Sequence, residues 1–371
     1  MKKLSRQSRR GLINALFIVG TFVLVMYFAL RSGDISQIIQ ALRSINPTWL
    51  LGGVLCFAVH AFIEGASLYV FFKFQKVPVN LRSNLIVGLI GMYYSAITPA
   101  ATGGQPMQVF SLKKRGVPPG VASSALAVKF FCWQCALLLL GAAAWIVHPG
   151  LVSETLDKGV WFLTVGFIAN SAAVVGVILL AISRNAVRAI IVFCVNLAYK
   201  LRIVKDRART SSRWDAALLD FHASVDILTR HPFQFLVLFA MSLVQVTALM
   251  SAVYFVYRGF GLNAAPYAHL VTVQLMLFIA ASFTPLPGAS GAQEGGFYLF
   301  LGKFFPSDSV FAAMFIWRFI TYYLSIIAGF AAVVADSAHG LKGRKALRAA
   351  MHAATSEAEA DDQAPGEEKP T

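Results

Sequence analysis

The feature that most constrains this chain is a series of apolar runs of about 20 residues, the length with which a helix crosses about 30 Å of hydrocarbon. These runs dominate the composition, since 57% of the 371 residues are apolar and only 13% are charged. A soluble domain carries about 25% charged residues, so a water-soluble enzyme is disfavoured. We predict an all-α polytopic membrane protein with six full spans, at residues 11–30, 48–72, 121–146, 159–182, 233–257 and 310–335.

Two further apolar segments are short for a crossing and end in helix-breaking residues. Residues 84–98 precede Pro99 and a Gly-Gly pair, and residues 268–284 precede Pro285 and Pro287. Irregular backbone at membrane depth is tolerated only where it is buried in protein or lines a wet cavity. We therefore predict two re-entrant hairpins, at residues 84–115 and 268–305.

The distribution of positive charge supports this topology. With a cytoplasmic N-terminus, six crossings and two hairpins, 25 Lys and Arg residues fall on the inside and five on the outside, as the positive-inside rule requires. The net charge of +15 is thus explained by loops beside apolar runs, and no nucleic-acid partner is expected. We predict a multi-pass protein of the cell (inner) membrane with both termini cytoplasmic, including a basic segment at 1–10 and a largely disordered tail at 337–371.

The membrane part divides into two similar units, at residues 11–146 and 159–336. The triplet Ile97-Thr98-Pro99 corresponds to Phe283-Thr284-Pro285, and Lys129 corresponds to Arg318. Three crossings separate equivalent points, and this odd number makes the two repeats inverted. Inverted repeats with interrupted helices are typical of transporters.

Residues 184–232 form an insert between the fourth and fifth predicted spans. Nine Lys and Arg residues alternate there with apolar residues at helical spacing. Such a pattern predicts amphipathic helices lying on the anionic inner leaflet.

Lys129 and Arg318 lie inside predicted spans. A charge at the bilayer centre costs about 2.5–3.5 kcal/mol, so it faces a wet or paired interior. One interpretation is that the two cations face a shared cavity and bind an anionic lipid head group, since Arg holds phosphate through two hydrogen bonds and Lys acts as a point charge. The other is that each pairs with a carboxylate such as Glu294, or that Lys129 snorkels.

The hairpin tips are the second candidate site, because glycines expose backbone N–H groups and a new helix N-terminus attracts anions. Alternatively, these residues only make tight turns and pack helices. The candidate substrate-binding residues of the tips are Thr98, Gly103, Gly104, Gln105, Thr284, Gly288, Gly291, Gln293 and Glu294.

Three acidic or imidazole side chains within apolar segments complete the candidates. Glu294, in the first turn of its short helix, is expected to cap that helix, to pair with Arg318 or Lys129, or to bind a proton or a cationic head group. His60 and Glu64 lie one helical turn apart and are candidates for a proton relay or for a polar helix contact. Two groups are too few for a metal site, and we predict no catalytic residues and no cofactor.

Two tip motifs and two downstream cations carry a resemblance to a known family. The motifs are Thr98-Pro99 with Gly103-Gly104-Gln105-Pro106, and Pro285-x-Pro287-Gly288-x-x-Gly291-x-x-Glu294, followed by Lys129 and Arg318 respectively. Over roughly residues 10–336 the chain resembles the lysylphosphatidylglycerol synthase transmembrane-region family, also described as flippase-like domain proteins.

The resemblance implies a function in lipid handling. In the multiple peptide resistance factor, a member linked to antimicrobial peptide resistance, a membrane part moves aminoacylated phosphatidylglycerol between leaflets and a soluble part transfers lysine from lysyl-tRNA. About 35 residues follow the last predicted span here, so we expect the membrane part without the transferase. Relatives with the membrane part alone are thought to handle other lipids, including hopanoid-related and polyprenyl-linked ones.

We therefore predict a translocator that moves an anionic or aminoacylated phospholipid, or a polyprenyl-type lipid, between leaflets. One alternative is a membrane component of lysylphosphatidylglycerol synthesis with phosphatidylglycerol lysyltransferase activity. Another is an accessory protein that docks a separate lipid-modifying enzyme through residues 184–232.

Overall fold

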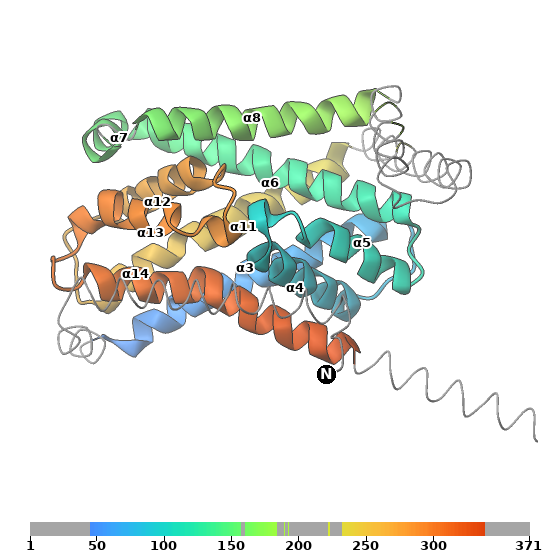
Figure 1. Cartoon of the computed structure of the whole chain (residues 1–371), viewed down its shortest axis with the longest axis horizontal. Helices are drawn as coiled ribbons and strands as arrows, with labels where there is room; N and C mark the ends of the chain where they lie inside the picture. The colour runs from blue at the N-terminus through green and yellow to red at the C-terminus, as the bar shows by residue number, and fades with distance from the viewer. Residues whose placement is uncertain are drawn as a thin grey trace, which may run out of the picture.

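The computed structural model of the chain (Figure 1) describes residues 45–156, 160–183 and 232–337, together with positions 189, 192 and 222. The segment 1–10, the first predicted span at 11–30, nearly all of the insert at 184–232 and the tail from residue 338 lie outside the described residues. The topology that these segments would complete stays a prediction.

The described residues form helices joined by turns, which confirms the all-α fold class. The α-helices are α3 (Pro47–Phe74), α4 (Leu81–Ile97), α5 (Gly104–Lys114), α6 (Pro119–Val147), α7 (Pro149–Leu156), α8 (Val160–Ile182), α11 (Pro232–Gly259), α12 (Tyr267–Ala281), α13 (Ala292–Gly296) and α14 (Val310–Arg318). Five helices are long and apolar enough to cross a membrane: α3, α6, α8, α11 and the helix that α14 begins and that continues to Ser337. They coincide with five of the six predicted spans, and the chain is a polytopic membrane protein.

The long helices are apolar around their whole circumference. On α3, Leu51 and Leu55 are 68% and 64% exposed, whereas Leu68 and Phe71 are buried. A helix that is apolar on every side has hydrocarbon on one side and protein on the other. The exposed leucines therefore mark the lipid-facing surface.

Helix ends coincide with capping residues in the sequence. The side chain of Asn46 accepts a hydrogen bond from Thr48 N at 3.0 Å, directly before Pro47 begins α3. Asn80 accepts one from Ser83 N at 2.7 Å and begins α4. An Asn cap followed by a first-turn proline is a favoured start for a helix, so these boundaries follow from local sequence.

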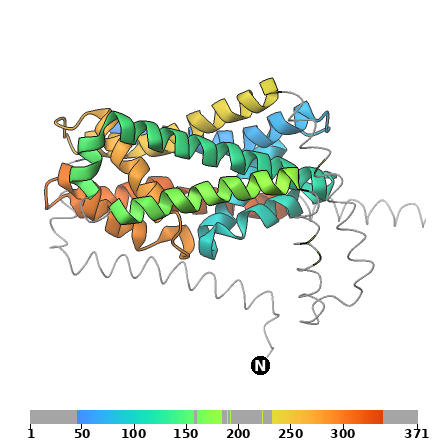
Figure 2. The ribbon, with the colours of Figure 1, turned by 90° about the horizontal axis from the view of Figure 1, so that it is seen from above.

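The order of long helix, hairpin and long helix occurs twice. Helices α3, α4–α5 and α6 form one set, and α11, α12–α13 and α14 form the other. The long helices run along the long axis of the molecule, with α3 packed against α11, and the hairpins α4–α5 and α12–α13 enter from opposite ends (Figure 1). Figure 2 shows the same opposition from above, with the two tips meeting midway along the long axis, near one face of the bundle.

Two glycines hold the first hairpin close to α3. A Cβ atom at Gly65 would lie 2.5 Å from Leu85 Cα, and one at Gly88 would lie 2.8 Å from Gly65 N. Small residues allow such close backbone contact between membrane helices. The contact fixes α4 beside the α3 turn that carries Glu64.

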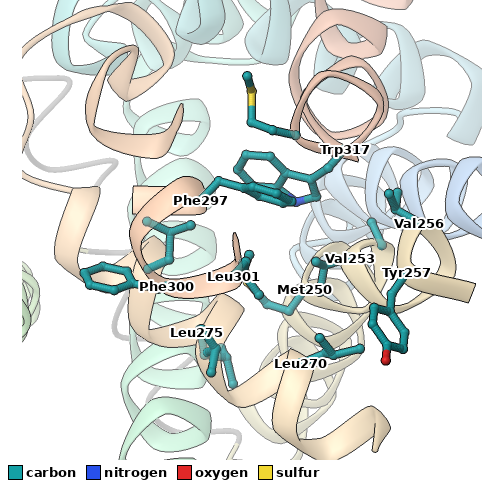
Figure 3. Close-up of a cluster of buried hydrophobic side chains, with 14 of the residues drawn as sticks. Met250, Val253, Val256, Tyr257, Leu270, Leu275, Phe297, Phe300, Leu301 and Trp317 are labelled. Carbon is teal, nitrogen blue, oxygen red and sulfur yellow. The ribbon is translucent and has the colours of Figure 1, made fainter. Parts of the chain in front are cut away.

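The second hairpin and the helix that follows it are less regular. After the short α13, the chain makes a π-helical turn at Phe297–Leu301, and a second π-helical turn at Phe319–Tyr323 directly follows Arg318. The rings of Phe297 and Trp317 pack at a centroid distance of 5.1 Å in the apolar core (Figure 3). Single π-helical turns inside helices are frequent at functional sites, which directs attention to Arg318.

Candidate functional site between the hairpin tips

The tips of the two hairpins contact each other midway along the long axis of the molecule. Each tip is a 3-10 turn, η1 (Pro99–Ala101) in the first hairpin and η3 (Pro287–Ala289) in the second. The backbone N–H of Ala100 donates to Pro285 O at 3.1 Å. Tyr322 Oη donates to Ala96 O, at the end of α4, at 3.0 Å. The contact therefore joins elements from both repeats.

The two tips share an unusual backbone conformation. Ala100 and Ala101 have φ of +50° and +54°, and Gly288 and Ala289 have φ of +59° and +52°. In each tip, two residues of positive φ follow a proline, Pro99 in the first tip and Pro287 in the second. The structure therefore aligns Pro99 with Pro287, two residues beyond the Pro285 that the alignment of the two repeats in the sequence had paired with it. Non-glycine residues rarely adopt positive φ, and such strain concentrates at functional sites.

A cavity of about 300 Å³ lies beside the contact between the tips. Its size is at the lower end of the range for small-molecule sites, about 300–1,000 Å³. The polar and aromatic side chains of its wall are Ser95, Gln274, Phe278, Ser282, Thr284, Gln293, Trp317, Arg318, Thr321 and Tyr322. The cavity is therefore lined by both hairpins and by the helix that carries Arg318.

Arg318 is fixed by several contacts. Its Nε donates to Glu294 Oε1 at 2.7 Å, one terminal nitrogen donates to Gly288 O at 2.5 Å, and the guanidinium lies 4.2 Å from the centroid of the Tyr322 ring. The second carboxylate oxygen of Glu294 accepts from Gly291 N at 2.6 Å. Glu294 thus caps α13 and pairs with Arg318 at the same time, and the cation is neutralised within the second repeat.

Three buried side chains in the cavity wall carry polar atoms without a hydrogen-bond partner. They are Gln274 Oε1, Gln293 Oε1 and Trp317 Nε1, on residues that are 2%, 4% and 2% exposed. A buried unpaired polar group costs about 1–3 kcal/mol. The site therefore has hydrogen-bonding capacity that the described residues do not use.

Lys129 lies in a different environment, a polar cluster between four helices. Its Nζ donates to Glu64 Oε1. The side-chain amides of Gln108 and Gln245 also donate to the Glu64 carboxylate, at 3.3 and 3.0 Å. We call Glu64, Gln108, Lys129 and Gln245 the Glu64 cluster. The structure places Arg318, but not Lys129, in the wall of the cavity, and each of the two cations has a carboxylate of its own.

His60 borders the Glu64 cluster. Its carbonyl accepts from Gln245 Nε2 at 3.3 Å, its ring lies 5.6 Å from the Trp133 ring, and its Nδ1 is buried without a partner. A relay through His60 and Glu64 stays a prediction. In the described part of the chain, no group of three or more His, Cys, Asp and Glu side chains could hold a metal ion.

The remaining predicted tip residues divide between the cavity and the turns. Thr284, Gly288 and Gln293 line the cavity. Thr98 Oγ1 accepts from Gly103 N at 2.8 Å and donates to Tyr94 O at 2.6 Å, which closes the first tip. Gly104 packs against Ser95, Gln105 is exposed, and Gly291 borders a second hollow.

This second hollow, of about 260 Å³, lies beside α8 and α12 and is largely apolar. Its wall includes Phe162, Leu277, Leu299 and Phe300, and it shares Thr284 with the cavity. Both walls are mostly apolar, the cavity carries more polar groups than the hollow, and the two meet at Thr284.

Sequence reasoning missed several polar and aromatic residues of both sites. Gln245 and Gln274 lie in the middle of apolar runs, where a polar side chain is costly unless it faces the protein interior, and this signal could have identified them. Trp317 and Tyr322 carried no such signal, because aromatic residues are common in these runs. The missed residues are Gln108, Gln245, Gln274, Trp317 and Tyr322.

Comparison with known proteins agrees with this architecture. A membrane protein of Archaeoglobus fulgidus, named "UPF0104 membrane protein", is 26% identical over 260 residues, which cover 68% of this chain and 75% of the relative. Residues 12–329, which include both hairpins and both buried cations, match the family described as "Lysylphosphatidylglycerol synthase TM region". The chain therefore belongs to the lysylphosphatidylglycerol synthase transmembrane-region family.

Proposed function

We propose that the protein is a lipid translocator of the cell (inner) membrane, with both termini cytoplasmic. It moves an anionic or aminoacylated phospholipid, or a polyprenyl-type lipid, between the two leaflets. The observation that carries this proposal is the cavity at the contact between hairpin tips that enter from opposite ends of the molecule. A site at such a position becomes accessible to either end when one hairpin moves relative to the other.

The combination of two adjoining hollows suits an amphipathic lipid. The cavity presents amide, hydroxyl and indole groups, whereas the neighbouring hollow presents Leu277, Leu299 and Phe300. If the head group occupies the cavity, the acyl chain starts near Thr284, which borders both the cavity and the hollow, and continues into the hollow. The name of the matching family refers to the synthesis of a lipid, which is consistent with a lipid substrate.

Transport is tested in vesicles that contain the purified protein and a lipid with a fluorescent acyl chain. Fluorescence that an impermeant reductant cannot reach reports the lipid of the inner leaflet, and its loss over time gives the translocation rate. We expect the wild-type protein to translocate lipid faster than protein-free vesicles, and Arg318→Ala to lower this rate about tenfold or more, since a buried hydrogen-bonded charge is removed from the site.

Arg115→Ala is the matched control. Arg115 is also paired with a carboxylate, that of Asp336, but it lies at the end of α5 and outside the cavity wall. We expect Arg115→Ala to translocate lipid at the wild-type rate. A wild-type protein no faster than protein-free vesicles would overturn the proposal, and a wild-type rate in Arg318→Ala, with the protein folded by size-exclusion chromatography, would show that the cavity does not carry the transport.

The family name also raises the alternative of lysyltransferase activity. Purified protein is incubated with lysyl-tRNA carrying labelled lysine and with phosphatidylglycerol vesicles, and the lipid extract is counted. We expect no label in the lipid. Transfer of label would favour the enzyme over the translocator.

A further inference from the structure

We propose that the cavity between the hairpin tips binds a hydroxyl-rich head group, such as a glycerol or sugar moiety, through Gln274, Gln293 and Trp317. The inference rests on the proposed function, because it names the part of the translocated lipid that occupies this cavity. It assigns the recognition to neutral hydrogen-bonding groups in place of the two buried cations.

The unpaired atoms define the chemistry of the ligand. Three residues of the wall, Gln274, Gln293 and Trp317, carry two amide oxygens and one indole N–H that are buried without partners. A hydroxyl group both donates and accepts hydrogen bonds, whereas an ammonium group only donates and an ionised phosphate only accepts. Hydroxyl groups therefore satisfy all three atoms, and they do so whichever end of each glutamine amide faces the cavity.

The charge of the wall agrees with a neutral ligand group. Among the described residues that line the cavity, Arg318 is the only charged one, and Glu294 balances its charge. Lys129 is occupied by the Glu64 carboxylate outside the wall. A phosphate in the cavity would meet a cation whose charge Glu294 already balances through Nε, whereas a neutral group needs no counter-charge.

Aromatic rings give the cavity flat apolar surfaces beside its polar atoms. Phe278, Trp317 and Tyr322 all line it. Trp317 is held by Phe297, whose ring packs against it (Figure 3). Trp and Tyr combine an apolar ring with a polar tip, and such a wall complements the C–H and O–H groups of a glycerol or a sugar ring.

The test compares lipids that share an acyl chain and differ in the head group. The hydroxyl-rich lipids are phosphatidylglycerol and glucosyl-diacylglycerol. Comparing them shows whether the hydroxyl-rich head group belongs to a phospholipid or to a glycolipid. The contrast lipids are phosphatidic acid, which is anionic without hydroxyls in its head group, and phosphatidylethanolamine, which carries an ammonium group. Binding to the detergent-purified full chain is measured by native mass spectrometry, and translocation is measured in vesicles.

We expect each hydroxyl-rich lipid to bind about tenfold more tightly than either contrast lipid, since a site built for hydroxyl groups rejects ligands that lack them. Gln293→Met and Trp317→Phe should each weaken that binding about three- to tenfold while leaving the contrast lipids unchanged, because each removes one hydrogen-bonding group and keeps the bulk of the side chain. Gln234→Met and Trp145→Phe, which change the same residue types outside the cavity wall, should bind all four lipids as the wild type does.

Equal binding of all four lipids, or tightest binding of phosphatidic acid, would overturn this inference. If lipid moves at equal rates for every head group, the inference fails and the proposed function stands. If hydroxyl-rich lipids bind selectively but none is translocated, the inference stands and the proposed function fails.

Discussion

Each hairpin is followed by a buried or partly buried cation that a carboxylate neutralises. The two repeats differ in the position of that carboxylate. In the first repeat the carboxylate is Glu64, on the long helix α3, and it joins Lys129 to two glutamine amides. In the second repeat it is Glu294, on the return limb of the hairpin itself, where it also caps α13. One cation is thus held by the surrounding helices and the other by the hairpin tip.

This difference separates a structural cluster from a site. The Glu64 cluster contains donors for both carboxylate oxygens and connects α3, α5, α6 and α11. The cavity beside Arg318 contains three polar atoms without partners, and π-helical turns follow both α13 and Arg318. A polar cluster whose groups are all hydrogen-bonded makes a core rigid. Buried polar groups without partners are instead candidates for binding a ligand. We therefore expect changes in the first repeat to act on stability and changes in the second to act on transport.

The largest effect on stability is expected from Glu64→Ala. The substitution leaves Lys129, whose side chain is 13% exposed, without its carboxylate, and removing one partner of a buried ion pair costs up to about 3–5 kcal/mol. The free energy of unfolding, from titration with a denaturing detergent, measures this loss. Adding Lys129→Met should restore much of it, because the unpaired charge is then gone.

A small loss in Glu64→Ala would contradict the structural role of the cluster. A similar loss in Glu294→Ala would remove the contrast between the repeats, since Arg318 still donates to the carbonyl of Gly288 and stacks on Tyr322.

The second prediction concerns the two tips. A Cβ atom at Gly288 would lie 2.2 Å from Tyr322 Cε2, and φ is positive there. Gly288→Ala should cost about 1–3 kcal/mol from overpacking and backbone strain and should slow transport by pushing Tyr322 into the cavity. Ala100→Gly in the first tip, where φ is also positive, should instead stabilise slightly, by about 0.5 kcal/mol, since relief of left-handed strain exceeds the added chain entropy.

Unfolding titrations of both variants and vesicle assays of Gly288→Ala check this prediction. An Ala100→Gly variant less stable than the wild type would show that the left-handed strain at Ala100 is smaller than the added chain entropy. Wild-type transport in Gly288→Ala would show that the second tip tolerates a side chain.

The helices and breaks could be predicted from the sequence, because both depend on local patterns. Apolar runs of spanning length, Asn caps and Pro-Gly clusters predict α3, α4 and α12 within a few residues of their ends. The pairing of Arg318 with Glu294 was one of the interpretations that the sequence left open, since both residues lie in one repeat.

The pairing of Lys129 with Glu64 could not be predicted, because it depends on how closely α3, α5 and α6 pack. Glu64 was grouped with His60 by helical spacing, whereas its contacts come from three other helices. The cavity is a product of the same packing. Its wall is drawn from segments as distant as Ser95 and Tyr322, and no spacing along the chain indicates that they meet.

The smallest effect is expected from an ion pair that links the first hairpin to the last helix. Arg115, which follows α5, pairs with Asp336, and the two side chains are 20% and 23% exposed. Arg115 also donates to Ser83 Oγ at 2.7 Å and to Ser111 O at 3.0 Å. Because the pair is partly solvated and Arg115 keeps these other partners, Asp336→Asn should cost less than about 1 kcal/mol and leave transport unchanged.

Salt distinguishes this pair from the buried ones. Raising the ionic strength from about 0.01 to 1 M shortens the Debye length from about 30 to 3 Å, so the difference in unfolding free energy between Asp336→Asn and the wild type should shrink with added salt. The loss in Glu64→Ala should persist, since buried charges are screened much less. If Asp336→Asn destabilised the protein as much as Glu64→Ala, the ion pair between Arg115 and the last helix would stabilise the first repeat as much as the Glu64 cluster does.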